Sequence, residues 1–466
     1  MGQNFLPDTV NQILMFPPSL HDWLPEGHLA RFLVDVVSAL DLGAFYASYS
    51  EKDGRGQAAY APELMVRLLL YGYATGVYSS RKIQARTYED IAFRFLSGDQ
   101  HPDHATIAEF RQRHLEALAS LFMQALLLCE KAGLVKLGHV SIDGTKIKAN
   151  ASKHKAMSYK RMNETGARLE REIAALLQRA EEADCSEDAQ YGKDKQGDEL
   201  PGELSRRESR LEKIRAAKQA LEEEAREKAE QERAEAEKKQ AEREEEERRT
   251  GKKKRGRKPA MPDLDKANPP DKAQRNFTDP DSRIMPDGAN KGSFLQGYNA
   301  QVAVDSVSQI IVAAEVTQET NDRQQLIPMI AQIVTSLEQK PEKISADAGY
   351  FSEANLNDEA VAGIDVHIAT GHDKHSDPVE STTAEASPGT TARQAMSHKL
   401  KTEAGHAVYK MRKAIVEPVF GQIKEVRGFR RFSLRGKQNV SHEWRLVCAV
   451  SNLLKLFRAG WAMQMA

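Results

Sequence analysis

The first 135 residues carry short apolar runs at helical spacing, separated by turn-forming residues. Pro62 precedes a dense apolar run that continues to Tyr73, and proline is favoured at the first position of a helix. Further helices are predicted over 88–96 and 106–130, with a turn at 102–106 that supplies an N-cap. We therefore predict an all-helical N-terminal domain.

From residue 136 onward, outside one charged stretch, β-rich runs alternate with helical patterns. The first run turns at Asp143-Gly144, and the next two follow one another closely enough to pair antiparallel. Early antiparallel strands, followed by strands that alternate with helices, predict a mixed α/β fold with a ribonuclease H-like sheet. The predicted strands are 139–148, 294–304, 310–316, 343–347 and 365–369, and the predicted helices are 323–337 and those within 398–458.

Residues 155–275 interrupt this pattern with a composition dominated by Glu, Lys, Arg, Ala and Gln. Residues 202–249 are strong helix formers, but their leucines are sparse and no heptad seam is sustained. A long solvated helix, a weak coiled coil and partial disorder are all open for this insertion. It closes with the basic run Lys252–Lys258, in which six of seven residues are Lys or Arg.

Composition narrows the class of protein without identifying it. The 466 residues carry a net charge of −1, because basic and acidic blocks cancel. Cys129, Cys185 and Cys448 have no paired metal-ligand spacing, so we interpret them as buried or incidental thiols in a reducing compartment. No apolar run approaches the length of a membrane span, and the N-terminus lacks the pattern of a secretory signal. We therefore expect a cytoplasmic protein.

Three acidic residues stand out by their context. Asp143 and Asp347 each lie at the end of an apolar run and closely precede a glycine, so a cation can approach a carboxylate whose direction the strand sets. Glu417 lies on a predicted helix that Pro418 is expected to kink or restart. Alone, each aspartate would be a turn former and Glu417 a solvated ion-pair partner, but together they predict an acidic catalytic centre. Most residues around Glu417 repeat at helical spacing: Tyr409, Arg412, Lys413 and Lys424.

Carboxylates that converge from two strands and one helix suit hard divalent cations. Phosphoryl transfer at a DNA backbone needs an activated hydroxyl or water and a stabilised leaving oxygen, and two Mg²⁺ ions about 3.5–4 Å apart supply both. Asp143, Asp347 and Glu417 are accordingly the predicted catalytic and metal-binding residues, with two Mg²⁺ ions, for which Mn²⁺ could substitute. Tyr409, Arg412, Lys413 and Lys424 would hold the phosphate backbone beside the metals.

Longer stretches resemble the DDE transposases of bacterial insertion sequences, in the branch with a helical N-terminal domain. The resemblance covers most of the chain outside the charged insertion. Four residues separate Arg412 from Glu417 where that family usually has three, so Lys413 stays beside Arg412 as a candidate for its role. The similar segments are Tyr71–Ile83, Asp90–Arg94, Pro102–Arg111, Asp143–Ala151, Thr278–Ser282, Gln296–Gln301, Ala346–Tyr350 and the helix with Tyr409, Arg412, Glu417 and Lys424.

The resemblance implies cleavage at the terminal inverted repeats of an insertion sequence, after which a freed 3′-hydroxyl attacks target DNA. It implies a nucleoid-associated bacterial protein that binds the terminal inverted repeats and the target DNA and does not bind a membrane. Because two DNA ends must be held together, we expect a homodimer or a larger synaptic complex. The alternatives are a ribonuclease H-like structure-specific nuclease without strand transfer and a non-catalytic DNA-bridging protein. The expected domains are a helical DNA-binding domain (1–135), a catalytic domain (136–154 and 276–458) and the insertion (155–275).

Basic residues outside the acidic centre are candidates for DNA contact. Residues 399–458 hold fourteen Lys or Arg, four Glu and no Asp, a net charge of +10 that suits phosphate binding. Phe429 and Phe432 in this stretch are predicted to pack in the core rather than stack on bases. The segment 255–259 resembles an AT-hook, and both minor-groove binding and non-specific phosphate attraction are open for it. The predicted DNA-binding residues here and in the N-terminal domain are Arg255, Arg257, Arg81, Lys82 and Arg111.

Overall fold

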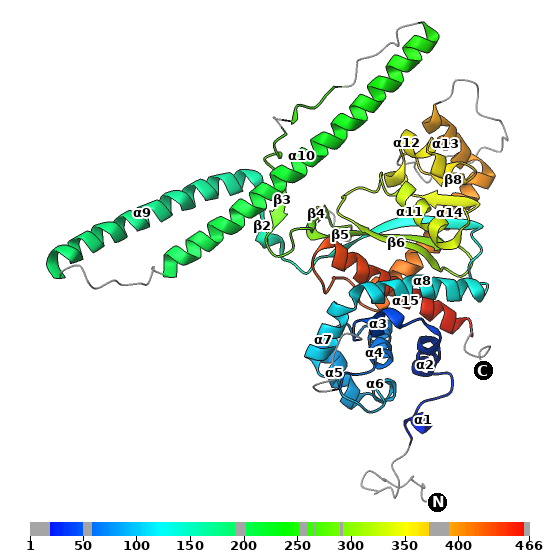
Figure 1. Cartoon of the computed structure of the whole chain (residues 1–466). Coiled ribbons are helices and arrows are strands. Elements are labelled where there is room, and N and C mark those ends of the chain that lie inside the picture. Colours follow the sequence, from blue (N-terminus) through cyan, green and yellow to red (C-terminus); the bar gives the residue numbers. More distant parts are fainter. Residues whose placement is uncertain are drawn as a thin grey trace, which may run out of the picture. The chain divides into compact units, whose positions relative to one another are not determined.

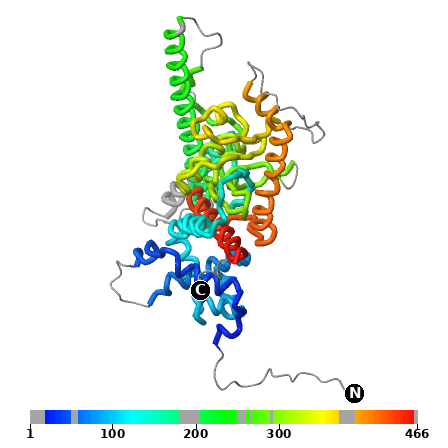
Figure 2. Tube along the Cα trace, turned by 90° about the vertical axis from the view of Figure 1, so that its right-hand side faces the viewer, coloured from blue at the N-terminus to red at the C-terminus, as the bar shows by residue number. Residues whose placement is uncertain are grey.

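The computed structural model describes residues 19–49, 58–191, 202–251, 260–264, 267–288, 292–371 and 391–460. The chain forms two compact units (Figures 1 and 2). One unit is Met1–Ile147 with Asn299–Ala466, and the other is Lys148–Tyr298. The functional domain boundaries proposed from the sequence stay predictions. Across the described residues, no helix is long and apolar enough to cross a membrane.

Helices alone fill the described residues before the first strand, which confirms the all-helical N-terminal prediction. Helix α4 has Pro62 in its first turn and ends at Gly76, whose φ of 78° is a left-handed conformation that glycine adopts at little cost. The helices are α1 Leu20–Trp23, α2 Leu29–Ala39, α3 Gly43–Ala47, α4 Pro62–Thr75, α5 Ser80–Glu89, α6 Ile91–Leu96, α7 His104–Arg113 and α8 Leu115–Lys131.

Two of the helices predicted in this region are helical but not continuous, because each breaks inside the predicted range. Asp90 ends α5 and caps α6, since its carboxylate accepts hydrogen bonds from the backbone N–H groups of Ala92 (2.9 Å) and Phe93 (3.3 Å). The segment 106–130 divides at His114, where α7 ends and α8 begins. The Asp90 side chain accepts hydrogen bonds from backbone N–H groups that would donate to backbone carbonyls in a continuous helix. The apolar pattern alone does not reveal this break.

One sheet organises the α/β region, and its order is β4-β5-β1-β7-β8 with β6 paired to β5. Strand β5 is antiparallel to β4 and β6, whereas β7 is parallel to β1 and β8. Backbone hydrogen bonds of 2.9 Å from Ser306 to His139 and from Ala149 to Gln296 make β1 antiparallel to β5. Four strands joined by antiparallel pairs (β1, β4, β5 and β6), followed by β7 and β8 in parallel pairs, confirm the predicted ribonuclease H-like mixed sheet. The strands are β1 His139–Lys148, β4 Arg283–Pro286, β5 Phe294–Asp305, β6 Ile311–Thr317, β7 Lys343–Ala346 and β8 Asp365–Ile368.

Strand β1 runs through Asp143-Gly144, so the predicted turn at this point is wrong. Its first four residues pair with β7, and Asp143 follows the last pair, Ile142 with Ala346. The strand continues because its other edge stays hydrogen-bonded to β5 as far as Ala149. Two adjacent turn-forming residues therefore lie inside a strand that is paired on both sides along part of its length.

Helix α15 (Lys437–Arg458) attaches to the sheet through buried polar side chains. The Asn452 amide accepts from the N–H of Ile311 (2.8 Å) and donates to its C=O (2.9 Å), and Trp444 donates to the Gln301 carbonyl (3.0 Å). The same helix lies along α8 (Figure 2). The remaining helices of this unit are α11 Leu326–Leu337, α12 Glu353–Leu356, α13 Ala392–Lys401 and α14 Glu403–Gly421, with short turns η3 Ala348–Tyr350, η4 Glu359–Val361 and η5 Gln422–Val426.

Several predicted core residues are buried. Phe429 and Phe432 are each 1% exposed, which confirms that they pack in the core. Cys129 and Cys448 are buried free thiols, as expected, and the side chain of Cys185 lies outside the described residues.

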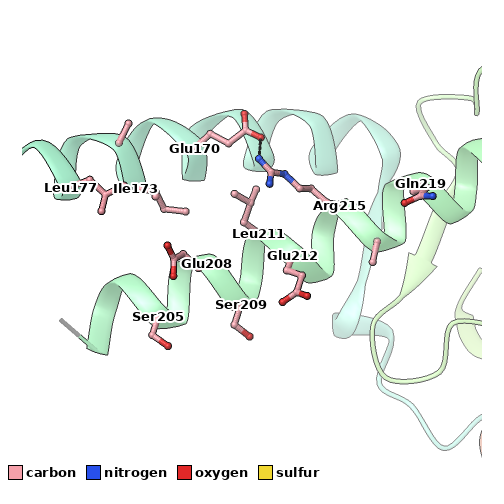
Figure 3. A pocket seen from close by; sticks show the side chains of 12 residues that line it. Glu170, Ile173, Leu177, Ser205, Glu208, Ser209, Leu211, Glu212, Arg215 and Gln219 are labelled. Atoms are coloured by element: carbon pink, nitrogen blue, oxygen red, sulfur yellow. Dashed lines mark hydrogen bonds and ion pairs between the residues drawn. The ribbon is translucent and has the colours of Figure 1, made fainter. Parts of the chain in front are cut away.

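The charged insertion forms two long helices, so the long-helix alternative holds over the described residues. Tyr159 of α9 donates to Glu222 of α10, and Glu170 of α9 pairs with Arg215 of α10. Residue numbers therefore increase along α9 as those of their partners on α10 decrease. The two helices are therefore antiparallel, and Figure 3 shows their apolar side chains between them. A small core of Met157, Met162, Leu169, Leu211, Ile214, Ala217 and Leu221 supports this pairing, so the insertion is also a short coiled-coil-like hairpin. The elements are η1 Lys153–Lys155, β2 Ala156–Ser158, α9 Tyr159–Tyr191, α10 Gly202–Thr250 and β3 Gln274–Asn276.

Candidate active site

Asp143 and Asp347 come together because they occupy matching places on neighbouring parallel strands. Ile142 of β1 pairs with Ala346 of β7, and each aspartate is the next residue along the chain. Asp347 also caps the η3 turn by accepting a hydrogen bond from the N–H of Gly349 (2.8 Å). The sheet thus directs two carboxylates into one region from residues 204 positions apart.

The electrostatics of Asp143 show how crowded this region is. Burial, together with the negative charges of Asp347 and Asp322, raises the pKa of Asp143 to about 6, although Arg412 opposes the rise. Arg412 reaches Asp143 from α14, with 3.0 Å between Nη1 and Oδ2. A carboxylate with a raised pKa next to other acids is typical of functional sites.

Helix α14 and the η5 turn, which is a π-helical turn, supply the basic side chains. Arg412 lies over the Tyr409 ring, 5.8 Å from its centroid, and Lys424 donates to the Thr145 hydroxyl (3.0 Å) on β1. Lys413 is exposed. Of the two candidates for the position before Glu417, it is therefore Arg412 that contacts an acid of the site.

Glu417 is placed differently from the two aspartates. It follows Arg412 by five residues, which is about 140° around an α-helix, and it is exposed. Within the described ranges it has no hydrogen bond or ion pair, and no group of three His, Cys, Asp or Glu side chains is close enough to hold a metal ion.

Pro418 lies inside α14 and does not restart it, because the helix continues to Gly421. Proline cannot donate to the carbonyl four residues earlier, and Gln309 does so instead, with its side-chain amide 3.0 Å from the Ala414 oxygen.

Sequence reasoning missed Asp322, which lies in the loop between β6 and α11. Its carboxylate accepts hydrogen bonds from the Asn299 (2.6 Å) and Gln301 (2.7 Å) side chains and pairs with Lys146 (3.6 Å). Two amides two residues apart on a strand face the same way. Their presence on one face of a buried strand is the sequence signal that could have pointed to a buried polar partner.

The residues predicted to contact DNA elsewhere differ in exposure. Arg81 and Lys82 are exposed on α5. Arg111 is half-buried and donates to the Tyr78 carbonyl (2.9 Å), so it links α7 to the loop between α4 and α5. Arg255 and Arg257 lie outside the described residues.

The donor chemistry of the site fits a divalent cation. Asp143 and Asp347 offer hard oxygen ligands. Burial and neighbouring acids raise the pKa of Asp143, and a bound cation would stabilise its ionised form. The nearby positive charge comes from side chains, Arg412 on Asp143 and Lys146 on Asp322. The two aspartates suit such an ion, and a third ligand would have to join them.

Fold and site together define a ribonuclease H-like protein with an acidic centre flanked by basic side chains. A transposase domain family of the DUF772 type matches residues 18–113, and a transposase DDE domain family matches residues 264–453. These two matches support an insertion-sequence DDE transposase. This family consists of nucleic-acid-processing enzymes that depend on divalent metals, and its domains imply DNA as the partner. No curated protein and no solved structure matches the chain.

Proposed function

We propose that this protein cuts DNA at the terminal inverted repeats of an insertion sequence and joins the freed 3′-ends to target DNA. The observation that carries the proposal is the convergence of Asp143 and Asp347 from neighbouring parallel strands, with Arg412 on Asp143. The match to a transposase DDE domain over residues 264–453 supports it.

In this proposal Asp143, Asp347 and Glu417 hold two Mg²⁺ ions, or Mn²⁺ in their place. When bound, the ions supply an activated water or 3′-hydroxyl and a stabilised leaving oxygen. Glu417 is available for this role because its carboxylate has no partner among the described residues. Arg412 and Lys424, which contact the strand that carries Asp143, bind and orient the phosphate backbone.

Glu417→Gln is expected to lower metal-dependent cleavage at least about a hundredfold, because a cation ligand loses its charge. The measurement is cleavage of labelled DNA from the ends of the element, with Mg²⁺ and with Mn²⁺. Glu403→Gln is the matched control, since Glu403 is an exposed acid on the same helix. Equal rates for the Glu417 variant and the control would remove Glu417 from the centre.

Strand transfer and simple cutting give different products from the same reaction. When a target plasmid is added, the proposed activity yields end DNA covalently joined to the plasmid. Cut ends without joined products would indicate a structure-specific nuclease instead. DNA bridging that survives loss of all three acids would indicate a non-catalytic role.

A reaction on two DNA ends requires that both be held at once, and we propose a homodimer or larger complex for this step. Light scattering of the protein with end DNA is expected to give two or more chains per pair of ends. A single chain that carries both ends would contradict this expectation.

A further inference from the structure

Asp322 is fixed more firmly than its place in a loop would require. Three side chains converge on its carboxylate: Asn299 at 2.6 Å, Gln301 at 2.7 Å and Lys146 at 3.6 Å. The two amides come from β5 and are fully buried. A charged group held by buried amides keeps a defined direction.

This network also includes the segment that carries Asp347. The Tyr350 hydroxyl, in the turn directly after Asp347, donates to the side-chain oxygen of Gln301. Asn299 contributes a second feature, because its side-chain oxygen is buried and has no hydrogen-bond partner among the described residues. A Cβ added to Gly144, the residue after Asp143, would lie 2.9 Å from that oxygen. A buried, unpaired amide oxygen therefore faces the strand that carries Asp143.

The glycines that follow the two aspartates leave space for Asp322. A Cβ at Gly144 would lie 2.9 Å from Asp322 Oδ1 and 2.3 Å from the Gln301 amide nitrogen. A Cβ at Gly349 would lie 3.4 Å from Asp322 Oδ2 and 3.0 Å from Asp347 Oδ1. Asp322 thus lies close to the segments of both aspartates, although it belongs to neither.

Lys146 is the cation that this arrangement controls. It lies on β1 three residues after Asp143, and 18% of its side chain is exposed. The negative charges of Asp322, Asp347 and Asp143 favour its protonated form by raising its pKa, against the lowering by burial. If Asp322 lost its charge, the aspartates at 143 and 347 would be the remaining acids that attract the Lys146 ammonium. An ammonium drawn to those carboxylates would compete with a divalent cation for them.

We infer that Asp322 is a positioning residue that holds Lys146 beside Asp143 and Asp347 but off their oxygens, so that these oxygens are free for a divalent cation. The inference rests on the proposed metal-dependent function of the same site. In this role Asp322 does not bind the cation, and removal of its charge acts through Lys146.

The test is calorimetric titration of the full chain with Mn²⁺, without DNA. Asp322→Asn is expected to weaken Mn²⁺ binding about tenfold, the size that follows when a full charge moves against two carboxylates in a partly buried site. Lys146→Met is expected to bind Mn²⁺ at least as tightly as the wild type, because a competing charge is gone. The double variant is expected to bind within about twofold of Lys146→Met. Glu319→Gln, an exposed acid three residues from Asp322, is the matched control.

The outcomes separate the possible roles of Asp322. If the double variant binds as weakly as Asp322→Asn, Asp322 is itself a ligand and the inference is wrong. It is also wrong if Asp322→Asn binds like the control, or if Lys146→Met weakens binding, which is decisive even where Asp322→Asn fails to fold. A folded wild-type chain that binds no Mn²⁺ would overturn the proposed function first, and this inference with it.

Discussion

Asp143→Asn is expected to lower metal-dependent DNA cleavage at least about a thousandfold, because the carboxylate is replaced by a neutral amide at the centre of the site. The assay is cleavage of labelled end DNA over a Mg²⁺ series. Glu353→Gln serves as the control, since Glu353 is an exposed acid in the same unit. Cleavage within tenfold of wild type would show that Asp143 is not at the reacting phosphate.

The same substitution is expected to stabilise the fold. The pKa of Asp143 rises from 3.8 to about 6 on folding, so at pH 7 the ionised group costs the folded state up to about 3 kcal/mol. The wild-type chain loses this stability as the pH rises from 3.8 through about 6, and Asp143→Asn does not. Urea unfolding at both ends of this pH range measures the difference. A variant less stable than wild type at pH 7 would mean that the ion pair with Arg412 outweighs burial.

Glu443→Ala is expected to cost about 3–5 kcal/mol of unfolding free energy, the largest stability effect we predict. Glu443 is fully buried and accepts hydrogen bonds from the Tyr73 hydroxyl (3.0 Å) and from the backbone N–H groups of Ser433 (2.9 Å) and Leu434 (3.2 Å). Burial raises the pKa of Glu443, and the charge of Arg111 opposes that rise. Alanine would leave one buried donor, two part-buried donors and one cation without this acceptor.

Urea unfolding of Glu443→Ala, Glu443→Gln and wild type tests this prediction. Glutamine keeps an acceptor oxygen, so it is expected to lose clearly less stability than alanine. Glu425→Ala is the control, because Glu425 is an exposed acid before α15 that pairs with Arg430. An alanine variant as stable as the control would show that the buried carboxylate is dispensable.

The predicted strands agree with the structure because their apolar residues are buried on both faces. Strand β5 is buried from Leu295 to Asp305, and β6, β7 and β8 begin within one residue of the predicted positions. Asp347 follows β7 directly, as its local sequence indicated. A run of neighbouring apolar residues indicates a buried strand, and such a run is visible in the sequence itself.

Other features depend on partners that are distant along the chain. The turn at Asp143-Gly144 is absent because β5, more than 150 residues later, pairs with β1 there. The role of Arg412 follows from its contact with Asp143, 269 residues away. The Asp322 carboxylate is held by Asn299, Gln301 and Lys146, which are all distant from it along the chain.

By itself, the sequence determined the helical N-terminal region, the mixed sheet, the strand-end positions of two aspartates and the transposase resemblance, because periodicity, strand ends and motifs are local properties. Only the tertiary structure decided that the two aspartates lie on neighbouring strands, that Arg412 rather than Lys413 contacts one of them, and that Asp322 pairs with Lys146. Electrostatic interactions act through space, so their partners are set by which strands and helices pack together.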